Sequence, residues 1–147
     1  MNIIEKFISG PNRTGKKMLG QRGVVIHFTA NFNKGAGALG HENYVSRTGT
    51  RVDGVVCEAD KKTKFRYGAA HFYVDSTNIV QYIPSNEVAP HVGAKTYTQL
   101  AKTLFKNNPN GYLLGIELCV NPDSNFIVAL ENVAELAAYL LKKNGLN

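Results

Sequence analysis

Two short apolar runs constrain the fold of this chain more than any other feature. Residues 22–28 contain an unbroken aliphatic stretch that ends at His27, and residues 112–120 are apolar except for Glu117 and its glycine. Turn-forming residues bound both runs, and their length suits a strand better than a helix, so both are predicted to be buried strands. Strands that are buried on both faces require covering helices on both sides of the sheet.

The remaining elements follow from alternation and helical spacing. Residues 69–75 and 78–84 are predicted to form a hairpin, and residues 41–47 and 97–105 two short helices. Residues 126–143 have helical periodicity, and an Asn-Gly stop signal follows them. The predicted buried stripe of this helix consists of Phe126, Leu130, Val133, Ala137, Leu140 and Leu141.

These elements predict an α/β fold, with a central mixed β-sheet flanked by helices. The chain has 147 residues, without an internal repeat or linker, so residues 1–147 are expected to form a single domain. Residues 10–17, 31–40 and 86–97 are predicted loops, and residues 48–68 are polar and irregular.

The net charge of +6 predicts attraction to polyanions, such as nucleic acid or an anionic cell wall. The basic stretch KKTKFRYG (61–68) is interpreted as a solvated loop, because no nucleic-acid-binding motif accompanies it. A basic nucleic-acid-binding domain stays as an alternative that rests on charge alone. No apolar run has the length of a membrane helix, and the first ten residues do not form a secretory signal, so synthesis in a cytoplasm is expected.

The spacing of the cysteines and histidines matches no metal-binding motif. Cys57 and Cys119 form no CxxC pair and are expected to be buried free thiols. The histidines show neither HxxxH nor HExxH spacing, so a structural or surface role is the simpler interpretation for each. His27 is better placed than the others, because ligands gather at the carboxyl ends of strands in open α/β sheets.

Glu117 is unusual because it lies within an apolar strand, where its two neighbours point to the opposite face. A buried carboxylate is costly unless it is paired. It could therefore lie on an edge strand in water, form an ion pair, or act as a general base with a raised pKa. With His27 on an adjacent central strand, a metallohydrolase becomes possible: zinc takes three protein ligands and a water, whose proton a nearby carboxylate accepts.

Several motifs occur here in a familiar order. They are VVIHFTAN, a Gly-rich loop, GHENYV, AAHFYVD, NIVQYIP, APHVGAKT and GIELCVN. In this order the sequence resembles the type-2 N-acetylmuramoyl-L-alanine amidases over roughly residues 20–143. These are the zinc amidases of phage endolysins and bacterial autolysins, related to the peptidoglycan recognition proteins.

The resemblance implies an amidase/peptidoglycan-recognition-protein-like fold, with a zinc ion in a groove. It implies cleavage of the amide between N-acetylmuramic acid and the L-alanine of the stem peptide. His27 is then a zinc ligand, Glu117 the group that assists the water, and His91 a substrate-binding residue of the groove. Pro90 stands where the family commonly has Trp.

The resemblance also bears on the other histidines. Some relatives have a catalytic tyrosine where this chain has Ala70, which favours Glu117 as the assisting group. His71 then has a structural role, with a hydrogen bond to backbone, and His41 is expected on the short helix, directed to solvent. The family's other two zinc ligands follow the long helix, so they are expected beyond residue 147, and the catalytic domain is expected to be truncated at its C-terminus. A substitute site that joins His27 to His71 or His91 is an alternative, whereas Cys119 is an unlikely ligand.

The predicted function is that of a zinc-dependent peptidoglycan hydrolase in phage lysis or cell-wall turnover. Bacterial peptidoglycan is the expected partner, without nucleic acid or membrane, and the expected place of action is the cell wall. The alternative is a non-catalytic peptidoglycan-binding module of the same fold. Such modules usually lack a metal ligand or the acid, so the presence of both His27 and Glu117 favours an enzyme.

Overall fold

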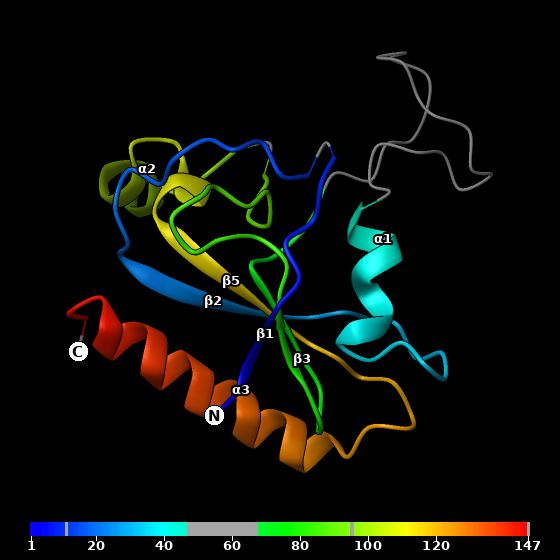
Figure 1. Ribbon diagram of the computed structural model, residues 1–147. Helices are drawn as coiled ribbons and strands as arrows, with labels where there is room; N and C mark the ends of the chain where they lie inside the picture. Colours follow the sequence, from blue (N-terminus) through cyan, green and yellow to red (C-terminus); the bar gives the residue numbers. More distant parts are fainter. Residues whose placement is uncertain (11, 47–67, 95, 147) are drawn as a thin grey trace.

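The computed structural model describes residues 1–10, 12–46, 68–94 and 96–146. Its centre is a mixed five-stranded sheet with the order β1-β4-β3-β5-β2 (Figure 1). Only the β3–β4 hairpin is antiparallel, and every other neighbouring pair in this sheet is parallel. The mixed sheet of the predicted α/β fold is therefore confirmed. The strands are β1 (Ile3–Glu5), β2 (Gly23–Phe28), β3 (Phe72–Val74), β4 (Ile79–Gln81) and β5 (Leu113–Leu118).

The three predicted helices are present. The long helix α3 begins after Asn125, whose side-chain oxygen accepts hydrogen bonds from the backbone N–H groups of Ile127 and Val128. Such a cap satisfies donors that the first helical turn would otherwise leave unpaired. The helices are α1 (Glu42–Ser46), α2 (Gln99–Phe105) and α3 (Phe126–Lys143), with 3-10 turns at Leu39–His41 and Pro109–Gly111.

Helix α3 covers one face of the sheet, along its lower side in Figure 1. Its buried residues are Ala129, Val133, Leu136 and Leu140, whereas Phe126 is 51% and Leu130 44% exposed. The predicted stripe was therefore wrong at Phe126 and Leu130. Helical spacing predicts how wide the apolar stripe of a helix is. The position of the sheet decides which residues at the edges of that stripe are buried against it.

Loops and the short helix α1 cover the opposite face, so the expectation of comparable helices on both sides was only partly met. Val45 of α1 is fully buried there, together with Ala38 of the Gly-rich loop. The Tyr82 hydroxyl donates a hydrogen bond to the Ala38 carbonyl at 2.8 Å, which fastens this loop to the end of β4. The candidate site lies on this face of the sheet.

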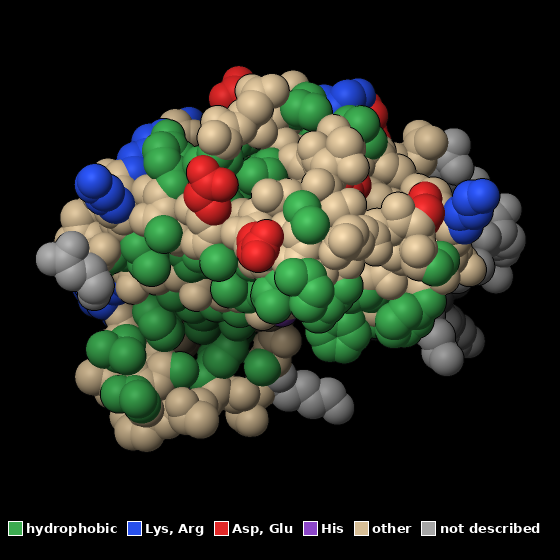
Figure 2. Space-filling view, turned by 90° about the horizontal axis from the view of Figure 1, so that it is seen from below, with side chains coloured by type: hydrophobic (Ala, Val, Ile, Leu, Met, Phe, Trp, Pro, Cys, Tyr) green, Lys and Arg blue, Asp and Glu red, His purple; other side chains and the backbone are tan. Residues whose placement is uncertain are grey.

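Strand β2 lies at the edge of the sheet, and the prediction of a fully buried strand at residues 22–28 was wrong. Ile26 is 53% and Phe28 61% exposed, because β5 is the only neighbour of β2 among the described strands. Figure 2 looks at the molecule from the α3 side and shows hydrophobic side chains gathered on this face. An aliphatic run does not reveal strand order, so edge and interior strands look alike in the sequence.

Strand β1 pairs in parallel with β4 and was not predicted, because three residues are too few to show alternation.

No helix in the described parts of the chain has the length and apolarity needed to cross a membrane. Cys57 and, except for Gly68, the basic stretch 61–68 lie outside the described residues.

Candidate functional site

Sheet register brings the two principal candidates together. His27 of β2 pairs directly with Glu117 of β5, and Tyr73 of β3 is the partner of Glu117 on its other side. Residues in register on neighbouring strands point to the same face of a sheet. The expected adjacency of His27 and Glu117 is therefore present, although β2 is an edge strand rather than a central one.

A cavity of about 660 Å³ opens beside these residues. This volume lies within the usual range of small-molecule sites. Its lining includes Glu117, His91, Tyr73, His41, Thr29 and Asn110. His27 is connected to this lining through His91, because its ring Nε2 lies 3.1 Å from His91 Nδ1.

Glu117 is a carboxyl group with no charged partner among the residues that the structure describes. Burial raises its pKa to about 7, and its Oε2 atom has no hydrogen-bond partner among the described residues. Strand β5 lies between β3 and β2, and no ion pair of the described residues involves Glu117. The edge-strand interpretation is thereby contradicted, and the ion-pair interpretation finds no partner among the described residues. A carboxyl group with a pKa near neutrality is suited to accept a proton from water.

His91 is held firmly in the cavity wall. Its Nε2 donates to the Leu113 carbonyl at 2.9 Å, and the backbone N–H groups of His91 and Val92 donate to Asn110 Oδ1 at 3.1 and 2.8 Å. The ring lies against Gly115, where a Cβ atom would stand 2.6 Å from the ring atoms. Burial lowers the pKa of His91 to about 4, so the ring is neutral at physiological pH.

His71 has the structural role that was predicted. It is fully buried, its Nε2 donates to the Glu87 carbonyl at 2.9 Å, and its Nδ1 accepts from the Gly115 N–H at 3.0 Å. Burial lowers the pKa of His71 to about 4. Because both ring nitrogens are engaged with backbone, His71 has no lone pair for a metal.

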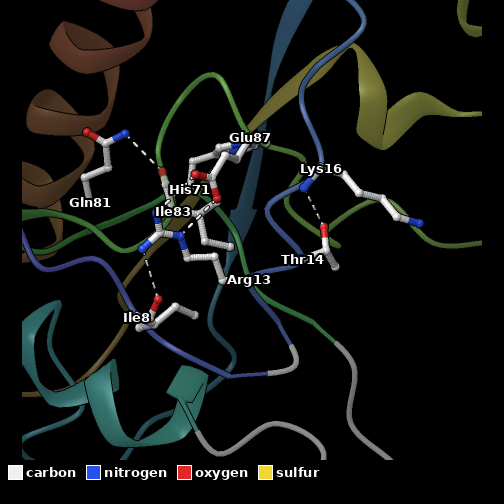
Figure 3. A network of polar contacts seen from close by, with 8 residues as sticks. All are labelled: Ile8, Arg13, Thr14, Lys16, His71, Gln81, Ile83 and Glu87. Carbon is white, nitrogen blue, oxygen red and sulfur yellow. Dashed lines mark hydrogen bonds and ion pairs between the residues drawn. The ribbon is translucent and has the colours of Figure 1, made fainter.

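An ion pair supports this histidine from outside the cavity (Figure 3). Arg13 donates from Nε and Nη2 to the Glu87 carboxylate at 2.9 and 3.1 Å, and from Nη1 to the Ile8 carbonyl at 3.3 Å. The guanidinium lowers the pKa of Glu87 by hydrogen bonding and by charge. The pair fastens the N-terminal segment to the loop that leads from β4 to His91.

His41 does not point to solvent as predicted. It is 5% exposed, its Nδ1 donates to the Gly37 carbonyl at 2.8 Å, and its ring lies 5.1 Å from that of Tyr73. The 3-10 turn before α1 directs the ring inward, a rotation that the sequence pattern does not specify. Sequence reasoning missed several residues of the cavity lining, among them His41, Tyr73 and Asn110. Asn110 lies in the turn motif NNPNG, and a turn motif does not show which residues its side chains will contact.

Cys119 is a buried free thiol, as predicted. Burial raises its pKa to about 12, and its Sγ lies 3.9 Å from His41 Nδ1. A thiol binds zinc as the thiolate, which this environment disfavours.

The described residues do not form a complete zinc site. Among them, no group of three or more His, Cys, Asp or Glu side chains is arranged to hold a metal ion. His71 has no free nitrogen, and both nitrogens of His91 are engaged, with the Leu113 carbonyl and His27. A substitute site that uses His71 is therefore contradicted, and His27 with His91 forms no complete metal site among the described residues.

Comparison with known structures identifies the fold. The structure matches the catalytic domain of XlyA, a protein of Bacillus subtilis, with a TM-score of 0.74 and 29% identity over 100% of this chain and 80% of that one. It also matches PlyL with a TM-score of 0.67 and 18% identity, over 100% of this chain and 77% of that one, which supports the fold alone. The predicted amidase-like fold is confirmed.

Sequence comparison identifies the family. The profile of the N-acetylmuramoyl-L-alanine amidases matches residues 17–147, and this chain belongs to that family. A probable N-acetylmuramoyl-L-alanine amidase of Bacillus licheniformis is 36% identical over 150 aligned residues, which cover 100% of this chain. The chain spans only 38% of the length of that relative.

Proposed function

We propose that this chain is a single catalytic domain of a peptidoglycan hydrolase in phage lysis or cell-wall turnover. It cleaves the amide between N-acetylmuramic acid and the L-alanine of the stem peptide, and it acts on the cell wall. Membership of the amidase family and the match to the XlyA catalytic domain support this proposal.

One observation within the site carries the proposal. The Glu117 carboxyl lies in the cavity wall with a pKa raised to about 7 and an Oε2 atom that has no partner in the described part of the chain. In its ionised form it accepts the proton of the water that attacks the amide carbonyl, and it then returns a proton to the leaving amine. The second transfer is favourable because an amine expelled from an amide must be protonated to leave.

The neighbouring residues shape the space around this carboxyl. His91 and Asn110 lie in the same wall, and their mutual hydrogen bond fixes the loop that borders the cavity. His91, which lies in this wall, is the residue that we expect to contact the substrate. The excess of Lys and Arg, 17 against 11 Asp and Glu, favours association with an anionic wall.

Zinc dependence is part of the proposal, with His27 as one ligand and the further ligands outside the described residues. The position of His27 supports this part of the proposal. Its imidazole, a common zinc ligand, lies in register with Glu117, whose carboxyl group is suited to activate water. When bound, zinc would supply a Lewis acid. The described residues supply the proton acceptor and the walls of the site.

The test is digestion of purified peptidoglycan by the full-length protein and by its Glu117→Gln variant, with and without added zinc. New N-terminal L-alanine without new reducing sugar ends is expected for the unaltered full-length protein, since only the amide is cut. The variant keeps the shape of the side chain but has no proton acceptor, so activity should fall by at least about a hundredfold. Reducing ends, or full activity of the variant, would contradict the proposal.

A non-catalytic peptidoglycan-binding module is the second candidate, and the incomplete metal site among the described residues favours it. Cosedimentation with insoluble peptidoglycan separates the two. Retention on peptidoglycan with no released alanine at any zinc concentration would support the binding module.

A further inference from the structure

The Leu113 carbonyl, the His91 ring and the His27 ring form a continuous hydrogen-bonded line beside the cavity. The Leu113 carbonyl lies 2.9 Å from His91 Nε2, and His91 Nδ1 lies 3.1 Å from His27 Nε2. The two rings are nearly perpendicular, at 78°, with centroids 5.4 Å apart. This line runs from the backbone of β5, through the loop that carries His91, to the edge strand β2.

The Leu113 carbonyl determines which nitrogen of His91 carries a proton. A carbonyl oxygen can only accept a hydrogen bond, so the proton of that bond belongs to His91 Nε2. Neutral imidazole carries one N–H and one lone pair. Neutral His91 therefore presents an unprotonated Nδ1 to its neighbour.

The second hydrogen bond then has a defined direction. A proton on His91 Nδ1 would make that ring a buried imidazolium, and no carboxylate of the described chain accepts a hydrogen bond from it. Burial without an opposite charge disfavours the charged form. The bond is therefore donated by His27 Nε2 to His91 Nδ1, which leaves the lone pair of neutral His27 on Nδ1.

We propose that His91 is a positioning residue that holds His27 in the Nε2-protonated tautomer, so that Nδ1 is the atom through which His27 binds a cation or accepts a proton. The proposal rests on the proposed function only in treating His27 as a residue of the reactive site. The tautomer itself is a property of the protein alone. Fixing a ring through a hydrogen bond at its far nitrogen is a general way to orient a histidine ligand.

The surrounding contacts leave His91 little freedom to turn. Asn110 Oδ1 receives the N–H groups of His91 and Val92, and Gly115 allows the ring to approach the strand as closely as it does. Rotation of the ring would break the bond to Leu113 and leave a buried N–H without a partner, which is costly. The backbone of β5 therefore determines, through His91, which nitrogen of His27 is available.

The experiment is nitrogen NMR of the histidine rings in the ¹⁵N-labelled 147-residue chain, in the presence of a chelator at pH 7.5. For His27 we expect a protonated Nε2, an unprotonated Nδ1, and a through-hydrogen-bond coupling between Nε2 and His91 Nδ1. A proton on His27 Nδ1, or on His91 Nδ1, would overturn the proposal.

Two variants test the role of His91 itself. In His91→Asn the amide oxygen can stand at the place of Nδ1 and still accept from His27, whereas in His91→Gln the amide group reaches toward Leu113 and offers His27 no such acceptor. We expect the His27 Nε2 proton to exchange with water about tenfold faster in His91→Gln, and to stay protected in His91→Asn. Equal protection in both variants would contradict the positioning role.

These outcomes are independent of catalysis. Backbone amide spectra establish that each variant is folded, and the tautomer of the unaltered chain decides the proposal even where a variant is not. If the 147-residue chain shows the expected tautomer while the full-length protein releases no alanine from peptidoglycan, the proposed function is refuted and this inference stands.

Discussion

At the scale of single residues, Glu117 shows how burial changes the acidity of a side chain. The same side chain in water would be fully ionised at neutral pH, whereas burial in the wall of the cavity raises its pKa to about 7. Its neighbour Tyr73 is also affected, since burial and the nearby carboxylate raise the pKa of the phenol. The site thus contains a carboxyl group that is close to half-ionised near neutral pH.

The raised pKa of Glu117 predicts a pH-dependent effect on stability. The folded chain holds this proton more tightly than the unfolded chain, whose Glu pKa is about 4.3, so the carboxyl favours folding least above pH 7. Glu117→Gln should therefore stabilise the fold by about 1–3 kcal/mol at pH 8, and the gain should vanish as the pH falls to about 4. Urea unfolding at a series of pH values measures this, with Glu131→Gln on the exposed face of α3 as the control.

At the scale of elements, β5 organises the site from both of its faces. Leu114, Ile116 and Leu118 pack toward α3, while Gly115 and Glu117 face the cavity side. Alternation along one strand therefore supplies the core, the space for His91 and the proton acceptor. Gly115 also bonds His71 through its N–H and carbonyl groups, which connects the strand to the residue before β3.

Substitution of Gly115 by Ala should displace His91. The added Cβ atom would stand 2.6 Å from the ring, far inside van der Waals contact, so either the ring or the strand must move. We expect a loss of about 1–3 kcal/mol in unfolding free energy and loss of the His27–His91 hydrogen bond. Urea unfolding and ring nitrogen NMR measure the two effects.

Gly93→Ala is the matched control for this substitution. A Cβ atom at Gly93 would meet nothing within 4 Å, although this glycine also lines the cavity. Stability and ring signals should stay near those of the unaltered chain. Equal effects of the two substitutions would show that the approach of His91 to β5 does not matter.

At the scale of the whole molecule, a few side chains hold distant segments around the cavity. The pair of Arg13 and Glu87 joins the N-terminal segment to the loop after β4, and the Glu87 carbonyl receives His71. Asp75 Oδ2 accepts from the N–H of Ala38 at 2.7 Å, which ties the Gly-rich loop to the end of β3. These contacts join residues that are far apart in the chain.

The ion pair of Arg13 and Glu87 should show a measurable coupling energy. It is bidentate, and the Glu87 side chain is only 10% exposed, so a double-mutant cycle to Ala should give about 1 kcal/mol. The pair of Lys6 and Glu42 is the control, because its side chains are 37% and 46% exposed. Its coupling should stay below about 0.5 kcal/mol. Equal coupling in both pairs would contradict a special role for Arg13.

The sequence by itself determined most of the elements and the main chemical candidates of this protein. Helical spacing fixed α3 at residues 126–143, alternation and turn signals gave the β3–β4 hairpin, and the polar interruptions of two apolar runs singled out His27 and Glu117. These signals are local, because spacing along the chain reports which side chains share a face of one element.

Only the tertiary structure decided how those elements combine. Strand order placed β2 at the edge, register set His27 opposite Glu117, and long-range contacts buried His41 and engaged both nitrogens of His71. Burial and pairing depend on residues that are far apart in the chain, so no local pattern specifies them. The raised pKa of Glu117 has the same origin, since it reflects what surrounds the carboxyl rather than what precedes it.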